Sequence, residues 1–133
     1  MIVALDIGLR RIGVALSPDA KVALPQEAIQ RKGRNQAAAE VSALLRRWGG
    51  DTLVVGIPRG GASEEEMERR IRHFITLLEL PKGMTVSYQD EAGSSVEAKE
   101  RMAGVTRQRR DGRIDSLAAQ VILERWLEAH GSG

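Results

Sequence analysis

The chain has 133 residues, which suits one domain, and 42% of them are hydrophobic, enough for a core. Only 3% are aromatic, so this core must be aliphatic. Charged residues make up 29% with a formal net charge of +2, which is typical of a folded protein rather than a disordered one. The absence of cysteine excludes disulfides, thiolate catalysis and cysteine-based zinc sites.

The first third of the sequence predicts three strands. Apolar runs at 2–5 and 12–16 flank a short turn that contains Gly8, the pattern of a β-hairpin. Residues 22–29 predict a third strand, and Pro25 indicates that it lies at a sheet edge or contains a bulge.

The middle third alternates between helical and strand patterns. Apolar residues recur with helical spacing from 35 to 48, and the glycine pair at 49–50 ends this helix. The run 52–57 is almost wholly apolar, as in a central strand that is buried on both faces. Ser63 and Glu66 form a capping-box pattern that predicts the start of a second helix.

The last third predicts one strand at 84–89 and two helices. A second capping-box pattern at 94–97 opens a helix to about 102, and the final helix runs from about 114 to 127. We expect a frayed tail at about 129–133. The order β-β-β-α-β-α-β-α-α predicts a single α/β domain over 1–133 with a mixed sheet whose later strands are parallel.

Three acidic positions do not suit a core. Asp6 ends the first strand, where it either caps the turn or serves as a metal ligand or general base, and the small Gly8 would let a ligand or backbone approach closely. Strand alternation puts Asp90 and Glu91 on opposite faces, so we expect one ligand and one supporting or exposed acid. Asp115 borders the apolar stripe of the final helix; its alternative role is a charge favoured by the helix dipole.

Convergence of three such acids has a chemical rationale. Hydrolysis of a phosphodiester needs an activated water, stabilisation of the charged transition state and help for the leaving oxygen. Two divalent ions held by Asp and Glu oxygens supply all three. Oxygen ligands favour Mg²⁺ or Mn²⁺ over zinc, and neither His73, on a helix, nor His130, in the expected tail, supports a histidine-based zinc site.

Arginines accompany these acids. Guanidinium groups bind phosphate oxygens well, although a solvated loop is the usual interpretation of such a run. Two arginines lie in the predicted hairpin turn after Asp6 and four precede Asp115, and these are the candidate nucleic-acid-binding residues: Arg10, Arg11, Arg107, Arg109, Arg110 and Arg113. Near-neutral total charge with arginine gathered around acids is the electrostatic outline of a phosphate-cleaving site.

Four motifs together resemble the YqgF/RuvX family: 6–15 (Asp-Ile-Gly-x-x-Arg-Ile-Gly-Val-Ala), 54–58 (Val-Val-Gly-Ile-Pro), 90–91 (Asp-Glu) and 115–123 (Asp-Ser-Leu-Ala-Ala through Ile-Leu). The resemblance implies an RNase H-like fold with a five-stranded mixed sheet flanked by helices. It also implies that Asp6, Glu91 and Asp115 match the acidic active-site positions of the family. The family's Arg-Leu-Thr-Thr-like stretch after Asp-Glu is replaced here by Ala92, Gly93, Ser94 and Ser95, and the polar loop after Gly-x-Pro by 59–62.

Family members act as pre-16S rRNA nucleases in 5′-end maturation or as Holliday junction resolvases. The resemblance therefore implies a nuclease with two Mg²⁺ or Mn²⁺ ions whose partner is precursor rRNA or branched DNA. No apolar stretch approaches about 18 residues, and we expect a cytoplasmic monomer or homodimer that does not bind membranes. The alternatives are an actin-type ATPase or sugar kinase, for which one domain is too short, and a non-catalytic nucleic-acid-binding module.

Overall fold

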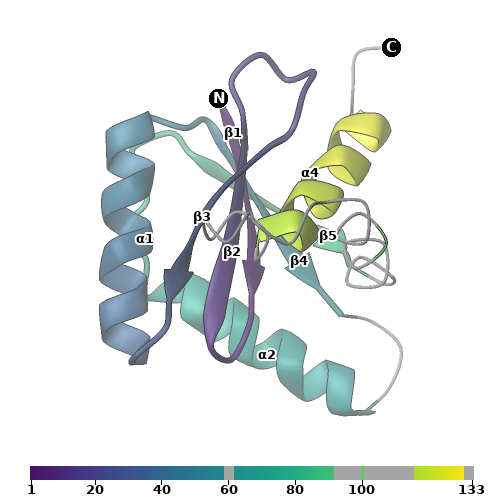
Figure 1. Cartoon of the computed structure of the whole chain (residues 1–133). Helices are drawn as coiled ribbons and strands as arrows, with labels where there is room; N and C mark the ends of the chain where they lie inside the picture. Colours follow the sequence, from purple (N-terminus) through teal and green to yellow (C-terminus); the bar gives the residue numbers. More distant parts are fainter. Residues whose placement is uncertain (59–61, 92–99, 101–115, 131–133) are drawn as a thin grey trace.

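The computed structural model describes residues 1–58, 62–91, 100 and 116–130 (Figure 1). In these residues one five-stranded sheet has the order β3-β2-β1-β4-β5. The strands are β1 (Ile2–Ile7), β2 (Arg11–Ser17), β3 (Leu24–Gln30), β4 (Thr52–Ile57) and β5 (Thr85–Asp90). The helices are α1 (Arg34–Trp48), α2 (Ala62–Thr76) and α4 (Leu117–His130).

The predicted mixed sheet is confirmed. β1 and β2 form an antiparallel hairpin, and β2 pairs antiparallel with β3, which is an edge strand as Pro25 indicated. β1, β4 and β5 are parallel neighbours. Because parallel strands end at the same edge, the carboxyl ends of β1, β4 and β5 lie beside the β1–β2 turn. We call this edge the carboxyl edge.

Helices cover both faces of the sheet, α1 and α2 on one face and α4 on the other (Figure 1). Strand alternation sends Val3, Leu5 and Ile7 of β1 into the α1/α2 cluster and Ala4 into the α4 cluster. Ala4 and Ala15 are fully buried beneath α4, and their short side chains let this helix approach the sheet closely.

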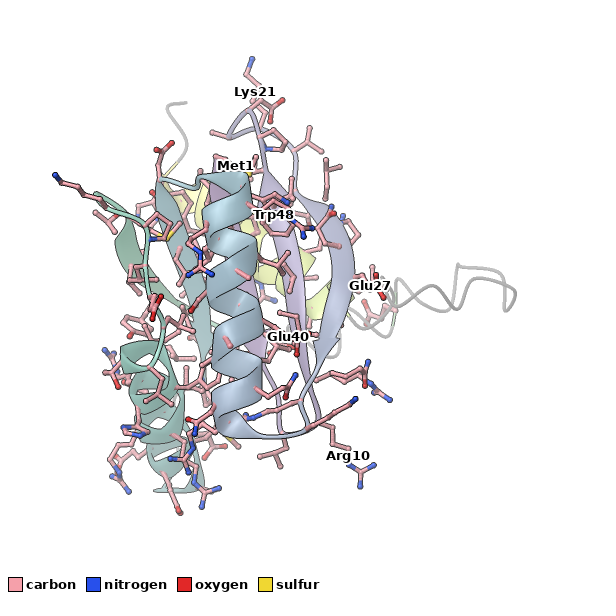
Figure 2. All side chains as sticks on the ribbon, turned by 90° about the vertical axis from the view of Figure 1, so that its left-hand side faces the viewer. Met1, Arg10, Lys21, Glu27, Glu40 and Trp48 are labelled. Carbon is pink, nitrogen blue, oxygen red and sulfur yellow. The ribbon has the colours of Figure 1, made fainter. Side chains whose placement is uncertain are left out.

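Each face of the sheet carries one tryptophan. Trp48 at the end of α1 is half-buried against the α1/α2 cluster, and Figure 2 shows it on the helix that fronts this face. Trp126 of α4 packs on the opposite cluster, and its indole N–H donates to the Ser87 hydroxyl of β5 at 2.8 Å. This hydrogen bond attaches the far part of α4 to the edge strand.

Helix ends differ in part from the sequence prediction. Gly49 ends α1 in the left-handed conformation (φ 63°), as predicted, and its N–H donates to the Leu45 carbonyl at 2.9 Å. Ser63 is not the N-cap of α2, because the helix already begins at Ala62 and the Ser63 hydroxyl donates to the Glu64 carboxylate.

The tail prediction was wrong for residues 129 and 130. α4 runs on to His130, whose ring stacks on Trp126 at 4.3 Å between centroids. The predicted helix at 94–102 lies outside the described residues except for Glu100, and the predicted helical residues 114 and 115 lie outside them too. Within the described part, no helix is both long and apolar enough to cross a membrane.

Candidate active site

Asp6 lies on the face of β1 that α4 covers. It pairs with Gly13 of β2 and follows Leu5, which faces the opposite cluster. Its carboxyl group is half-buried. Since Asp6 is the penultimate residue of β1, its side chain lies at the carboxyl edge.

Glu91 reaches Asp6 across the intervening strand. Its backbone N–H donates to the Ile57 carbonyl at 3.0 Å, which extends the β4–β5 pairing by one residue. The Asp6 and Glu91 carboxyl groups are hydrogen-bonded to each other, although β4 lies between β1 and β5. We call these two residues the acid pair.

Gly56 of β4 makes this contact possible. A Cβ atom at this position would lie 3.0 Å from Glu91 Oε2 and 2.5 Å from Cδ1 of the fully buried Ile122 in α4. Any larger side chain would therefore occupy the space through which the Glu91 carboxylate passes. The glycine of the Val-Val-Gly-Ile-Pro motif is a spatial requirement of the acid pair.

Burial governs the protonation of the acid pair. It raises the pKa of Glu91 to about 7, with further contributions from the Asp6 charge, the hydrogen bond to Asp6 and the Asp90 charge. Burial also raises the pKa of Asp6, and the hydrogen bond from Glu91 partly offsets this rise. Within the pair, the hydrogen bond therefore favours the proton on Glu91 and the negative charge on Asp6.

A hydrogen bond between distant segments fixes the start of α4 next to this edge. The backbone N–H of Val14 donates to the buried Ser116 hydroxyl at 2.9 Å, beside the register shift between Ile12 and Val14 of β2. Gly13, the pairing partner of Asp6, precedes Val14. Sequence reasoning did not single out Ser116; its signal is a small polar residue at the start of an apolar helix.

The turn between β1 and β2 carries two of the predicted arginines. Arg10 and Arg11 are both exposed, and Figure 2 shows Arg10 extending from the tip of the turn. The Gly8 N–H donates to the Arg11 carbonyl at 3.0 Å, and a Cβ at Gly8 would lie 2.7 Å from that oxygen. Gly8 therefore admits the Arg11 backbone and closes the turn, which confirms the backbone alternative of the sequence expectation.

The remaining predicted residues cannot be placed. Asp115 lies outside the described residues, as do Arg107, Arg109, Arg110 and Arg113. The expected split of the neighbouring acids holds, since Asp90 is exposed while Glu91 is half-buried against Asp6. Among described residues, no group of three or more His, Cys, Asp or Glu side chains forms a ready metal site.

The family model described as "RuvX: Holliday junction resolvase" matches residues 1–129. The chain belongs to the RuvX family. A protein of Sulfurovum sp. (strain NBC37-1) named "Putative pre-16S rRNA nuclease" is 56% identical over 93% of this chain and 95% of its own length. A protein of the same name from Campylobacter jejuni subsp. doylei is 53% identical over 91% of this chain and 92% of its own length.

Solved structures show that this RuvX chain has the fold of RNase H-like resolvases, as expected. The fowlpox virus Holliday junction resolvase aligns with a TM-score of 0.56 and 17% identity over 96% of this chain and 98% of its own. Thermus thermophilus RuvC, in complex with a Holliday junction substrate, aligns with a TM-score of 0.53 and 14% identity over 99% of this chain and 97% of its own.

Proposed function

We propose that this RuvX protein is a metal-dependent endonuclease that cleaves phosphodiester bonds at the acid pair, with Asp115 as the third acid. The observation that carries the proposal is the contact between Asp6 and Glu91, two carboxyl groups on non-adjacent strands. The position of Ser116 supports the assignment of Asp115. The Ser116 hydroxyl accepts a hydrogen bond from the N–H of Val14, and Val14 follows Gly13, the partner of Asp6 in the sheet. The next residue toward the N-terminus is Asp115.

The acid pair suits a divalent cation. It offers only carboxylate oxygens, the ligands that Mg²⁺ and Mn²⁺ prefer. Partial burial raises the pKa of Glu91 to about 7, so cation binding near neutral pH would release a proton from the fraction of Glu91 that is protonated and relieve the repulsion between the two charges. Asp6, Glu91 and Asp115 would hold the metal, and two ions are proposed by analogy with other carboxylate nucleases. The bound metal would supply an activated water and stabilise charge on the phosphate.

The protein's own residues would position the substrate. The hydrogen bond from Glu91 favours the ionised form of Asp6, so Asp6 would be the first ligand for the cation, and Glu91 would become one when its proton leaves. Arg10 and Arg11 on the turn, with Arg107, Arg109, Arg110 and Arg113, would bind phosphate groups on either side of the cleaved bond.

The proposed substrate is precursor 16S rRNA at its 5′ end, acted on in the cytoplasm during ribosome biogenesis. The names of relatives that are more than 50% identical support this assignment. The alternative is Holliday junction resolution, which the family description favours. A resolvase that nicks two opposite strands symmetrically needs a two-fold dimer. In the described ranges the exposed large apolar residues are divided between two ends of the sheet, with Leu9 in the β1–β2 turn and Val22 and Leu24 where β3 begins.

Substitution of single acids tests the catalytic assignment. Asp6→Asn, Glu91→Gln and Asp115→Asn should each lower the rate of cleavage in Mn²⁺ by at least about a hundredfold, because each removes a charged ligand. Nucleic-acid binding, measured by fluorescence anisotropy, should be retained. Asp90→Asn is the matched control, since this exposed acid lies next to Glu91 on the other face, and it should cleave like the parent.

Two results would contradict the proposal: an Asp6→Asn protein that cuts as fast as the parent, or an Asp90→Asn protein as slow as Glu91→Gln. The same assay decides the substrate. A precursor rRNA fragment and a four-way DNA junction in one Mn²⁺ buffer should differ in cleavage rate, with the rRNA fragment cut faster and at one position.

A further inference from the structure

A strongly basic pocket opens at the carboxyl edge on the α2 side of β1, away from the acid pair. The β1–β2 turn, the start of α1 and residues of α2 line its volume of about 490 Å³. Four of its described lining residues are arginines, and one, Glu66, is acidic. We call this site the basic pocket, and its four arginines are Arg31, Arg34, Arg69 and Arg70. None of these four belongs to the arginines that sequence analysis singled out.

Arg31 is held in place by three contacts before any ligand arrives. Its guanidinium donates to the Gly8 carbonyl at 2.9 Å and lies 5.3 Å above the ring centroid of the buried Phe74. Its backbone N–H donates to the Arg10 carbonyl at 2.8 Å. A cation fixed in this way loses little side-chain entropy on binding an anion.

The rim of the pocket keeps its positive charge available. Arg34 and Arg69 are both exposed, and the single acid Glu66 pairs with Arg70 at 2.9 Å within α2. Guanidinium groups bind phosphate oxygens through two parallel hydrogen bonds. The pocket therefore suits a ligand that carries more than one phosphate.

The floor of the pocket is apolar. The buried Ile71 and Phe74 and the half-buried Met67 line it, and Leu9, with 69% of its surface exposed, adds a further apolar side chain to the pocket wall. A cationic rim around an apolar floor matches a nucleotide, whose phosphates contact the arginines while its unpaired base lies against the aliphatic side chains. A base that remains stacked in a duplex has no free face to offer this floor.

We propose that the basic pocket binds a single-stranded segment of the nucleic acid next to the bond that is cut. This inference rests on the proposed nuclease function. Ile7 lines the pocket and directly follows Asp6 in β1, so a strand that passes over the β1–β2 turn contacts both sites. Arg10 extends from the tip of that turn (Figure 2).

Binding without cleavage tests this proposal separately from the catalytic one. The probes are a fluorescent RNA duplex with a short single-stranded flank and the same duplex with blunt ends. Affinity is measured by anisotropy in EDTA with Asp6→Asn as the parent. Adding Arg34→Ala and Arg69→Ala should weaken binding of the flanked probe about tenfold, and should lower the slope of log affinity against log salt by about 1.4 for two phosphate contacts.

The matched control removes two charges from the opposite edge of the sheet through Lys21→Ala and Lys82→Ala, which should change binding less than about twofold. Glu66→Gln should strengthen binding of the flanked probe, because it frees Arg70 and removes the acid. Since Arg34 and Arg69 are exposed, the thermal midpoint of the variant should match that of its parent.

Equal losses from the pocket and control variants would overturn the proposal, and so would equal losses for flanked and blunt probes. An acidic protein partner would be indicated instead if the pocket variant lost affinity for a poly-glutamate peptide and kept its affinity for RNA. Absence of cleavage by the unsubstituted protein in Mn²⁺, with flank-dependent binding intact, would refute only the nuclease proposal.

Discussion

Glu91 holds its proton near neutral pH because it is half-buried beside the Asp6 carboxylate. Its pKa of about 7 in the folded protein lies above the ordinary value of 4.5 in the unfolded chain. The folded state then binds more protons than the unfolded state between these two values, so stability falls as pH rises through this window. The loss is complete about one pH unit above the folded-state pKa of about 7.

A pH series of urea unfolding in EDTA measures this effect. The free energy of unfolding of the parent should decrease from about pH 5 to pH 8, and Glu91→Gln should remove most of the decrease because the amide does not titrate. A parent whose stability rises over the same interval would contradict the described environment of Glu91.

Because Gly56 has no side chain, it leaves space for the Glu91 carboxylate and for Ile122. Gly56→Ala should destabilise the protein by about 1–3 kcal/mol, because its methyl group would meet Ile122 Cδ1 in a filled core. It should also weaken Mn²⁺ binding by displacing Glu91. Adding Ile122→Val removes the Cδ1 atom and should restore part of the stability but not the metal affinity. Urea unfolding and calorimetric metal titration of both variants separate the two effects; full recovery of both would contradict this account.

At the scale of elements, the attachment of α4 to β2 depends on one hydroxyl. Ser116→Ala should cost about 1–3 kcal/mol, since the buried N–H of Val14 would lose its partner. Ser17→Ala is the matched control: this hydroxyl is equally buried, has no partner in the described ranges, and its removal should leave stability unchanged or raise it. Urea unfolding of both variants checks the contrast, and equal costs would contradict it.

Strands were predictable because their signal is local. The all-apolar 52–57 run indicated a doubly covered strand, and β4 indeed lies between two parallel neighbours. The start of α2 was not predicted correctly, because a Ser-x-x-Glu pattern reports a local preference that the helix overrides by beginning at Ala62. The Ser116 bond joins segments 102 residues apart, so no local pattern predicts it.

For the acid pair, local sequence patterns could predict which of the two neighbouring acids faces inward, but not that Glu91 contacts Asp6. Alternation after β5 correctly separated Asp90 from Glu91, since side-chain period is a property of a single strand. That Glu91 would cross β4 depends on the order of the strands and on Gly56, which acts by leaving space. The Asp115 assignment stays a prediction.

At the scale of the whole molecule, metal binding and folding stability are linked. A divalent ion that binds only the folded protein should raise the thermal midpoint, and the rise grows with ion concentration. Mn²⁺ should therefore stabilise the parent and the Asp90→Asn control, but not Asp6→Asn. An unshifted midpoint in the parent would favour the non-catalytic nucleic-acid-binding alternative. Differential scanning fluorimetry with and without EDTA suffices for this comparison.

The two tryptophans lie on opposite faces of the sheet, so their intrinsic fluorescence can report on each face separately. Trp126 is bonded to Ser87 on the α4 side, whereas Trp48 lies against the α1/α2 cluster. Replacing Trp48 with phenylalanine would leave a single emitter on the helix that carries Ser116 near its start. Its emission wavelength during unfolding would then reveal whether this helix detaches before the rest of the sheet melts.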